Sequence, residues 1–324
     1  METSSSEFPD LQTLIFGLMC AFTRNGRGSG EVTVLDRRLA EYSSTFPTEV
    51  VACRLDDGTE RRLLCKYAAE HVHEVYKHKG GGRYEARVYA QVLRPLEMST
   101  PAFYGTFFDP TTSKTWLILE YVERSLWVNK ACEESAMTLA ASWIGRFHSA
   151  AQARLVVDLI PFLHRYDSDY YLGWVRRTLM FAAGMHEKFP WLANLCAHAE
   201  ELLALLWEAP QTIIHGEYYP ENVLFSSGII YPVDWESAAI GPGEIDLAAL
   251  TEGWPSKFAS ECEFEYKRAR WPRSAPAHFQ RILDAARLYL HFRWLGDRPE
   301  WTADEKCFWH FECLRALSVH LMGD

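Results

Sequence analysis

Three polar side chains near position 220 have the types and spacing to do chemistry together. Glu217 follows His215-Gly216, Asn222 lies five residues after Glu217, and Asp234 lies twelve residues after Asn222. Moving a phosphoryl group from a nucleotide to an alcohol requires a carboxylate that orients the hydroxyl and accepts its proton, and hard oxygen ligands for Mg²⁺. Glu217 is the candidate catalytic base, and Asn222 and Asp234 are the candidate metal ligands.

The same reaction needs a lysine on the nucleotide phosphates and an acidic residue that holds the lysine. Lys66 follows three apolar residues in a predicted strand, and Glu85 comes 19 residues later at the start of a predicted helix. We predict that Glu85 pairs with Lys66 and positions its ammonium for the nucleotide. Glu74 is the alternative partner.

Two further segments are candidates for binding the nucleotide. Ser43, Ser44 and Thr45 fall where a phosphate-covering loop would lie, although a plain polar turn is an equal alternative. Glu120 and Val122 end an apolar strand, where the carbonyl of Glu120 and the amide of Val122 are expected to hydrogen-bond the adenine. Backbone groups make these last contacts, so the side-chain types carry little of the argument.

Hydrophobic periodicity divides the chain into a strand-rich first third and a helical remainder. The first third has predicted strands over 49–55, 62–67, 101–107 and 115–122 and a predicted helix over 84–93. The remainder has predicted helices over 137–152, 172–180, 191–207, 279–294 and 306–321. Short strands over 212–214, 223–225 and 229–233 flank the Glu217 loop.

These elements predict an α+β, two-lobed, protein-kinase-like fold. Residues 1–122 form a β-rich N-terminal lobe that binds the nucleotide and includes an N-terminal helix and the Glu85 helix. Residues 123–324 form a mainly helical C-terminal lobe that carries the catalytic loop and the acceptor site.

The segment 213–250 resembles the aminoglycoside phosphotransferase and choline kinase family of small-molecule kinases. The loop of that family reads His-Gly-Asp, then Asn five residues on, a strand ending in Asp, a later Gly and Asp-Leu-Ala. The matches here are His215-Gly216, Asn222, Asp234, Gly241 and Asp246-Leu247-Ala248. The resemblance implies that Asp246 holds the catalytic loop by hydrogen bonds without touching substrate, with His215 as further support.

The chain departs from the family pattern at Glu217, where the family carries Asp. Glu is one methylene longer, so its carboxylate reaches the same point only if the backbone sits further back, and an error of ~1 Å can cost roughly a hundredfold in rate. Glu236 is expected to tune the metal site or to face the substrate, with a solvated loop position as the alternative. Asp169 is a further substrate-facing candidate, with helix capping as the alternative.

Charge and composition narrow the class of partner. The chain has 43 acidic and 33 basic residues, and its net charge is −10. This balance argues against nucleic acid as a partner, because phosphate backbones attract Lys and Arg. It favours a cationic substrate, although solubility alone would also explain it.

The cysteines and the N-terminal region indicate a cytoplasmic protein without a membrane partner. Eight cysteines are scattered singly, with no Cys-x-x-Cys pair and no zinc-finger spacing, which is typical of a reducing compartment. The apolar run 11–22 is too short to span a bilayer and lacks the basic flank of a signal peptide. We predict that it forms a helix packed on the fold.

These observations together predict an ATP- and Mg²⁺-dependent phosphotransferase that acts on a hydroxyl of a small molecule. An amino sugar, such as an aminoglycoside, or an amino alcohol is the expected acceptor class, and antibiotic resistance and metabolic phosphorylation are both compatible with it. A nucleotide-binding pseudokinase is the alternative that Glu217 supports. A protein kinase is a second alternative, which the lack of Ala-Pro-Glu and of a long activation segment disfavours.

Overall fold

A computed structural model describes residues 8–24, 31–40, 46–69, 78–131, 135–154 and 160–323. By internal contacts the chain divides into two compact units. The first unit comprises residues 1–73, 79–125 and 231–236, and the second comprises residues 74–78, 126–230 and 237–324. The division after residue 122 stays a proposal from the sequence.

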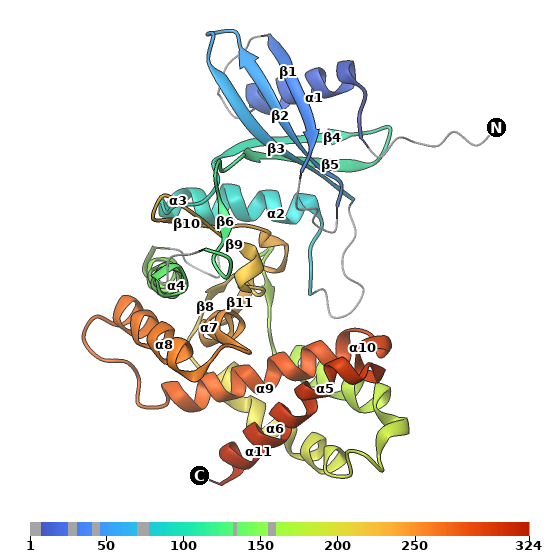
Figure 1. Ribbon diagram of the computed structural model, residues 1–324, viewed down its shortest axis with the longest axis vertical. Coiled ribbons are helices and arrows are strands. Elements are labelled where there is room, and N and C mark those ends of the chain that lie inside the picture. Colours follow the sequence, from blue (N-terminus) through green and yellow to red (C-terminus); the bar gives the residue numbers. More distant parts are fainter. Residues whose placement is uncertain are drawn as a thin grey trace, which may run out of the picture. The chain divides into compact units, whose positions relative to one another are not determined.

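The first unit is built on a five-stranded antiparallel sheet in the order β1-β2-β3-β5-β4 (Figure 1). Its strands are β1 (Val32–Leu39), β2 (Thr48–Leu55), β3 (Glu60–Ala69), β4 (Phe103–Asp109) and β5 (Lys114–Glu120). Lys66 lies in the central strand β3, opposite Thr48 of β2 and Leu117 of β5. Sequence periodicity did not predict β1, because most of its side chains are not buried and its apolar pattern is weak.

The N-terminal helix α1 (Leu11–Arg24) packs on this sheet (Figure 1). Leu14 and Leu18 are fully buried in one apolar cluster with Trp116 and Ile118 of β5. The predicted packing of the apolar run on the fold is therefore confirmed.

The helix that carries Glu85 is composite. It begins with α2 (Gly82–Val88), continues through the π-helical turn η1 (Tyr89–Leu93) and ends with α3 (Arg94–Leu96). A Cβ atom on Gly82 would lie 2.6 Å from the Cβ of Ala68 on β3, so this position requires a glycine. The close approach of α2 to β3 brings Glu85 within reach of Lys66.

The second unit is mainly helical. Its helices are α4 (Ser135–Arg154), α5 (Ser168–Phe181), α6 (Leu192–Glu208), α7 (Glu244–Thr251), α8 (Ser256–Arg270), α9 (Phe279–Asp297), α10 (Pro299–Ala303) and α11 (Trp309–Met322). The sequence pattern did not predict α8, because few of its side chains are buried and its apolar stripe is narrow.

Two small sheets frame the Glu217 loop. One has the order β10-β9-β6, with β6 (Leu126–Trp127), β9 (Val223–Ser226) and β10 (Ile229–Pro232). The other has the order β7-β11-β8, with β7 (His164–Arg165), β8 (Gln211–Ile214) and β11 (Ala239–Pro242). The loop lies between β8 and β9, so both of its ends are anchored in strands.

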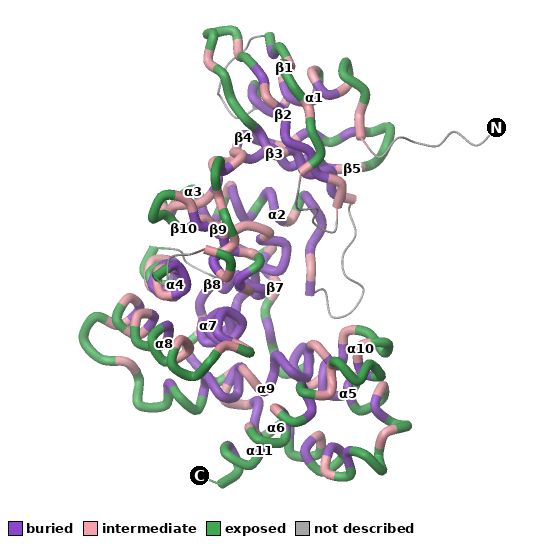
Figure 2. The backbone as a smooth tube through the Cα atoms, viewed as in Figure 1, coloured by how far each residue is buried: buried purple, intermediate pink, exposed green. Residues whose placement is uncertain are grey.

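Helix α9 is the most buried long helix of the second unit, and Figure 2 shows most of it as buried. It packs against α5, α7 and α11. A charged side chain on the buried face of α9 must therefore find partners inside the protein.

Two further observations concern disulfides and membrane-spanning helices. All seven cysteines within the described ranges are free. In the same ranges, no helix combines the length and the apolar character that crossing a membrane requires.

Candidate active site

Lys66 lies at the centre of a charge cluster in the first unit. Its Nζ donates to Glu85 Oε2 at 2.8 Å and also contacts Asp234 Oδ1. Lys66 and Glu85 are buried, with 6% and 1% of their surface exposed. The structure thus brings together the predicted pair and adds a carboxylate that lies 168 residues from Lys66 in the chain.

The pairing keeps Lys66 charged despite its burial. Burial opposes the charge on the ammonium, but Asp234 and Glu85 outweigh it and raise the pKa of Lys66 well above its ordinary value. Burial and the Asp234 carboxylate raise the pKa of Glu85, against the attraction of Lys66.

A tight turn aims Asp234 at Lys66. Asp234 has a φ of 66°, in the left-handed region that Asp tolerates better than most residues. The next residue, Trp235, is fully buried, and its backbone N–H donates to Glu85 Oε1 at 3.2 Å. Glu85 therefore fixes both the lysine and the turn that carries the candidate metal ligand.

Glu236 joins the same cluster. It has 3% of its surface exposed, and Lys79 Nζ donates to its Oε1 at 2.9 Å. Burial and the neighbouring Asp234 carboxylate raise the pKa of Glu236 to about 7. The alternative of a solvated loop position is therefore wrong, because this carboxylate is buried and paired.

Asp246 holds the backbone of the Glu217 loop in the second unit. It lies fully buried in the first turn of α7. Its two carboxylate oxygens accept hydrogen bonds from the backbone N–H groups of His215, at 2.7 Å, and Gly216, at 2.9 Å. His215 is also fully buried, and its Nδ1 accepts from the Glu217 backbone N–H at 3.3 Å. Both residues hold loop backbone.

Gly216 is required for the shape of this loop. Its φ is 84°, and a Cβ there would lie 2.2 Å from the backbone oxygen of Ser237. Both the left-handed backbone and the close approach exclude other residues.

A hydrogen-bonded chain extends from Asp246 into the core. His148 Nε2 lies 3.0 Å from Asp246 Oδ2, and its Nδ1 lies 3.0 Å from the hydroxyl of Tyr266. Burial lowers the pKa of His148 to about 4, so the ring is neutral. A neutral ring donates one hydrogen bond and accepts the other, which satisfies both neighbours.

Glu217 is buried, and both of its carboxylate oxygens have donors. Arg293 of α9 contacts Oε1, and the hydroxyl of Ser237 donates to Oε2 at 3.1 Å. Both Arg293 and Glu217 have little exposed surface, 4% and 6%. The candidate base is thus one member of a buried ion pair.

His78 completes this group beside Glu217 and Arg293. Arg293 Nε donates to His78 Nε2 at 2.9 Å, so that nitrogen is the acceptor, and the other, Nδ1, carries the proton toward Tyr170 at 2.7 Å. In this tautomer the 3.3 Å approach of His78 Nε2 to Glu217 Oε1 is not a hydrogen bond. Arg293 therefore links the imidazole to the carboxylate.

Asn222 ends the short 3₁₀ turn η4 (Pro220–Asn222). Its Nδ2 donates to the backbone oxygen of Glu217 at 2.9 Å. This bond sets the orientation of the amide group, and the amide oxygen is the candidate ligand atom.

The remaining predicted residues have varied positions. Ser43, Ser44 and Thr45, and the alternative partner Glu74, lie outside the described residues. Glu120 ends β5, and its side chain accepts from the Ala102 backbone N–H at 3.0 Å. Val122 is buried, and Asp169 is exposed in the first turn of α5. The roles of these residues stay predictions.

Sequence reasoning missed Arg293, His78, Ser237 and Lys79. Arg293 had a usable signal, since it lies on the apolar helix pattern of 279–294 at helical spacing from Ala286 and Tyr289. An arginine on such a face needs a buried anionic partner. For the other three residues, the sequence offers no comparable pattern.

Comparison with known proteins supplies the family. Residues 54–279 match the model of the phosphotransferase enzyme family. The chain belongs to this family. The predictions of a family resemblance and of a small-molecule phosphotransferase are confirmed at this level. A search of curated proteins gave no match.

Solved structures with the same fold include several kinases. The GDP complex of wild-type aminoglycoside 2′-phosphotransferase IIIa has a TM-score of 0.62 at 10% identity, over 96% of this chain and 99% of that one. Choline kinase from Streptococcus pneumoniae has a TM-score of 0.56 at 14% identity, over 90% and 94%. The putative fructosamine-3-kinase from Haemophilus somnus 129PT has a TM-score of 0.57 at 14% identity, over 95% and 99%. The predicted α+β, protein-kinase-like fold is confirmed.

The neutral His148 makes the stability of this phosphotransferase family member depend on pH. The unfolded chain takes up a proton as the pH falls through about 6.5, whereas the folded ring stays neutral down to about 4. The free energy of unfolding is therefore not reduced by His148 above pH ~6.5. It falls by up to roughly 3 kcal/mol as the pH drops from ~6.5 toward 4. Urea unfolding of the wild type and of His148→Gln at several pH values between 6.5 and 4 measures this loss of stability. The variant should show a shallower loss than the wild type, and exposed His186→Gln should show the wild-type slope.

Proposed function

We propose that this chain transfers the γ-phosphoryl group of ATP, with Mg²⁺, to a hydroxyl of a small molecule. The observation that carries the proposal is the buried Lys66, which is paired with Glu85 and Asp234. A lysine kept charged inside a protein and surrounded by carboxylates suits the phosphates of a nucleotide and their metal. The match to the phosphotransferase enzyme family supports the same reaction.

The donor groups of the first unit fit Mg²⁺. Glu85, Asp234 and Glu236 contribute three carboxylates against the two ammonium groups of Lys66 and Lys79. Burial is the main cause of the raised pKa values of Glu85 and Glu236, and the neighbouring Asp234 carboxylate raises both further, a repulsion that a cation would relieve. We assign Asp234 as a ligand of this ion, because Mg²⁺ prefers oxygen donors. The assignment of Asn222 as a second ligand rests on the sequence pattern. When bound, the ion would neutralise charge on the phosphates.

Glu217 is proposed to orient the acceptor hydroxyl and to take its proton. Arg293 and Ser237 hold its carboxylate in a single position, which favours orientation. Because each oxygen already has a donor, proton transfer uses a remaining lone pair or follows the opening of one contact.

We propose an amino sugar or an amino alcohol as the acceptor. The net charge of −10 favours a cationic substrate. The similar structures are named for aminoglycoside, choline and fructosamine kinases, all of which are named for hydroxylated amines. Resistance and metabolism both remain compatible roles, and the free cysteines support a reducing cytoplasm.

Steady-state ADP release with Mg-ATP and a panel of hydroxylated amines tests the proposal. We expect turnover on at least one amino sugar or amino alcohol above the rate without acceptor. Mass spectrometry of the phosphorylated product identifies the hydroxyl that received the phosphoryl group. Tight binding of Mg-ATP with no turnover on any acceptor would contradict the proposal.

That negative outcome defines the alternative, a nucleotide-binding pseudokinase. The observation in its favour is the buried ion pair between Glu217 and Arg293, which occupies the candidate base. In this alternative the pair stabilises the loop. The charge cluster around Lys66 would then serve nucleotide binding alone.

Glu217→Gln is expected to lower turnover by roughly 10²- to 10⁴-fold, because the amide cannot accept the proton. Affinity for Mg-ATP should change little. Initial rates and nucleotide titrations separate the two effects. Glu221→Gln, an exposed glutamate of the same loop, is the matched control and should keep normal turnover. Normal turnover of Glu217→Gln would show that the base assignment is wrong.

Asp234→Asn is expected to weaken nucleotide binding in the presence of Mg²⁺ by roughly tenfold or more. The amide is a poorer Mg²⁺ ligand than a carboxylate. Titrations with and without Mg²⁺ should show that the loss is confined to the metal-dependent part. Exposed Asp36→Asn, also in the first unit, is the control. An unchanged magnesium dependence in Asp234→Asn would count against its role.

A further inference from the structure

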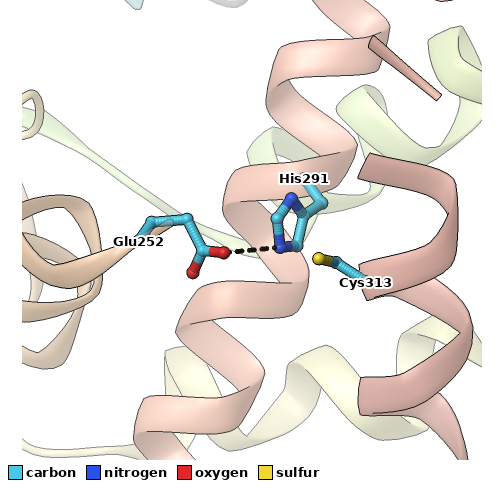
Figure 3. A group of neighbouring side chains, drawn as sticks. All are labelled: Glu252, His291 and Cys313. Atoms are coloured by element: carbon cyan, nitrogen blue, oxygen red, sulfur yellow. Dashed lines mark ion pairs between the residues drawn. The ribbon is translucent and has the colours of Figure 1, made fainter. Parts of the chain in front are cut away.

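Three side chains of different chemical type converge in the second unit, away from the Glu217 loop. Glu252 follows α7, His291 lies on α9 and Cys313 lies on α11. One ligand atom of each lies within 4.8 Å of the other two. Figure 3 shows the three side chains pointing toward one another from their separate elements. No two of these residues are close in the sequence, so only the helix packing brings them together.

His291 has an unsatisfied nitrogen that points into this group. The ring has 1% of its surface exposed, and its Nε2 has no hydrogen-bond partner among the described residues. The nearest anion is Glu252 Oε1, at 3.3 Å. This contact is long and is not aligned as a hydrogen bond, so the nitrogen and the carboxylate are placed to share either a proton or a cation.

A second histidine contacts the other ring nitrogen of His291. The two Nδ1 atoms of His291 and His310 lie 2.9 Å apart, so one ring must donate to the other. When His291 Nδ1–H donates to His310, the lone pair of His291 Nε2 faces the carboxylate of Glu252. This is the hydrogen bond that metal-bound histidines make through their second nitrogen.

The donor set selects the metal. A thiolate, an imidazole and a carboxylate are the ligands of Zn²⁺, whereas Mg²⁺ and Ca²⁺ take oxygen ligands alone. In a tetrahedral zinc site the ligand atoms lie about 3.5 Å apart. The separation of up to 4.8 Å therefore needs an inward movement of only about an ångström, which half-buried Glu252 and Cys313 can make by side-chain rotation.

The fourth position of such a site would be open. Glu252, His291 and Cys313 line a pocket of about 400 Å³ that also includes Trp254 and Arg287. Three protein ligands and an open position are typical of zinc sites that bind water or a small ligand.

We propose that Glu252, His291 and Cys313 bind one Zn²⁺ ion whose fourth position opens to this pocket. The ion ties the end of α7 to α9 and α11. It stabilises the folded chain, because it binds the three side chains only when these elements are packed. The proposal does not depend on the proposed function of the Glu217 loop.

Cobalt titration of the full chain, after treatment with a chelator, tests the site. Co²⁺ should give one equivalent of binding, visible absorption of a four-coordinate ion and a near-ultraviolet thiolate-to-cobalt band, and Zn²⁺ should displace it. Zn²⁺ should also raise the melting temperature of the chelator-treated protein. Cys313→Ser should lose the thiolate band and weaken binding by roughly tenfold or more. His291→Gln should weaken binding similarly.

Cys307→Ser is the matched control, since this half-buried cysteine lies six residues before Cys313 and outside the group. It should bind Co²⁺ as the wild type does. Circular dichroism checks that each variant is folded, and Cys313→Ser carries the test if His291→Gln does not fold. The proposal is overturned if the wild type gives no thiolate band, or if Cys313→Ser keeps it. The first outcome would indicate a plain hydrogen bond from His291 to Glu252.

Discussion

The burial of the Lys66 ammonium is the constraint on which the site of the first unit depends. An ion removed from water costs several kcal/mol unless other charges compensate it. Glu85 and Asp234 provide this compensation, one from α2 and the other from the turn after β10. Because one charge needs both partners, the strand, the helix and the turn hold one another in place. The groups that satisfy the buried lysine are also the groups suited to a nucleotide and its metal.

In the second unit, the buried carboxylate of Asp246 likewise fixes the groups that pair with it. Its buried carboxylate accepts two backbone N–H groups of the Glu217 loop and is joined to His148. A loop whose backbone donors end on a helix-borne carboxylate has few alternative conformations. The position of Glu217 is thus set by groups that need not touch a substrate.

The contact with Arg293 gives a physical reason for Glu at position 217, where the family carries Asp. The longer side chain reaches the guanidinium on α9 and the hydroxyl of Ser237 at once. A buried arginine needs an anion, and Glu217 supplies one. Position 217 is therefore under a structural demand in addition to any catalytic one. The resulting ion pair is compatible with orientation of an acceptor and with a purely structural role.

The sequence by itself determined the order of strands and helices in outline, the loop of Glu217 and the family. Those features are encoded in local periodicity and in residues a few positions apart, such as Asn222 after Glu217. Only the tertiary structure decided that Arg293 contacts Glu217, that Lys79 contacts Glu236 and that His291 meets Cys313. These pairs join positions whose spacing follows no local period. Their contact depends on how helices and strands pack, and a buried charge or an unpaired nitrogen has consequences only once packing has removed the water around it.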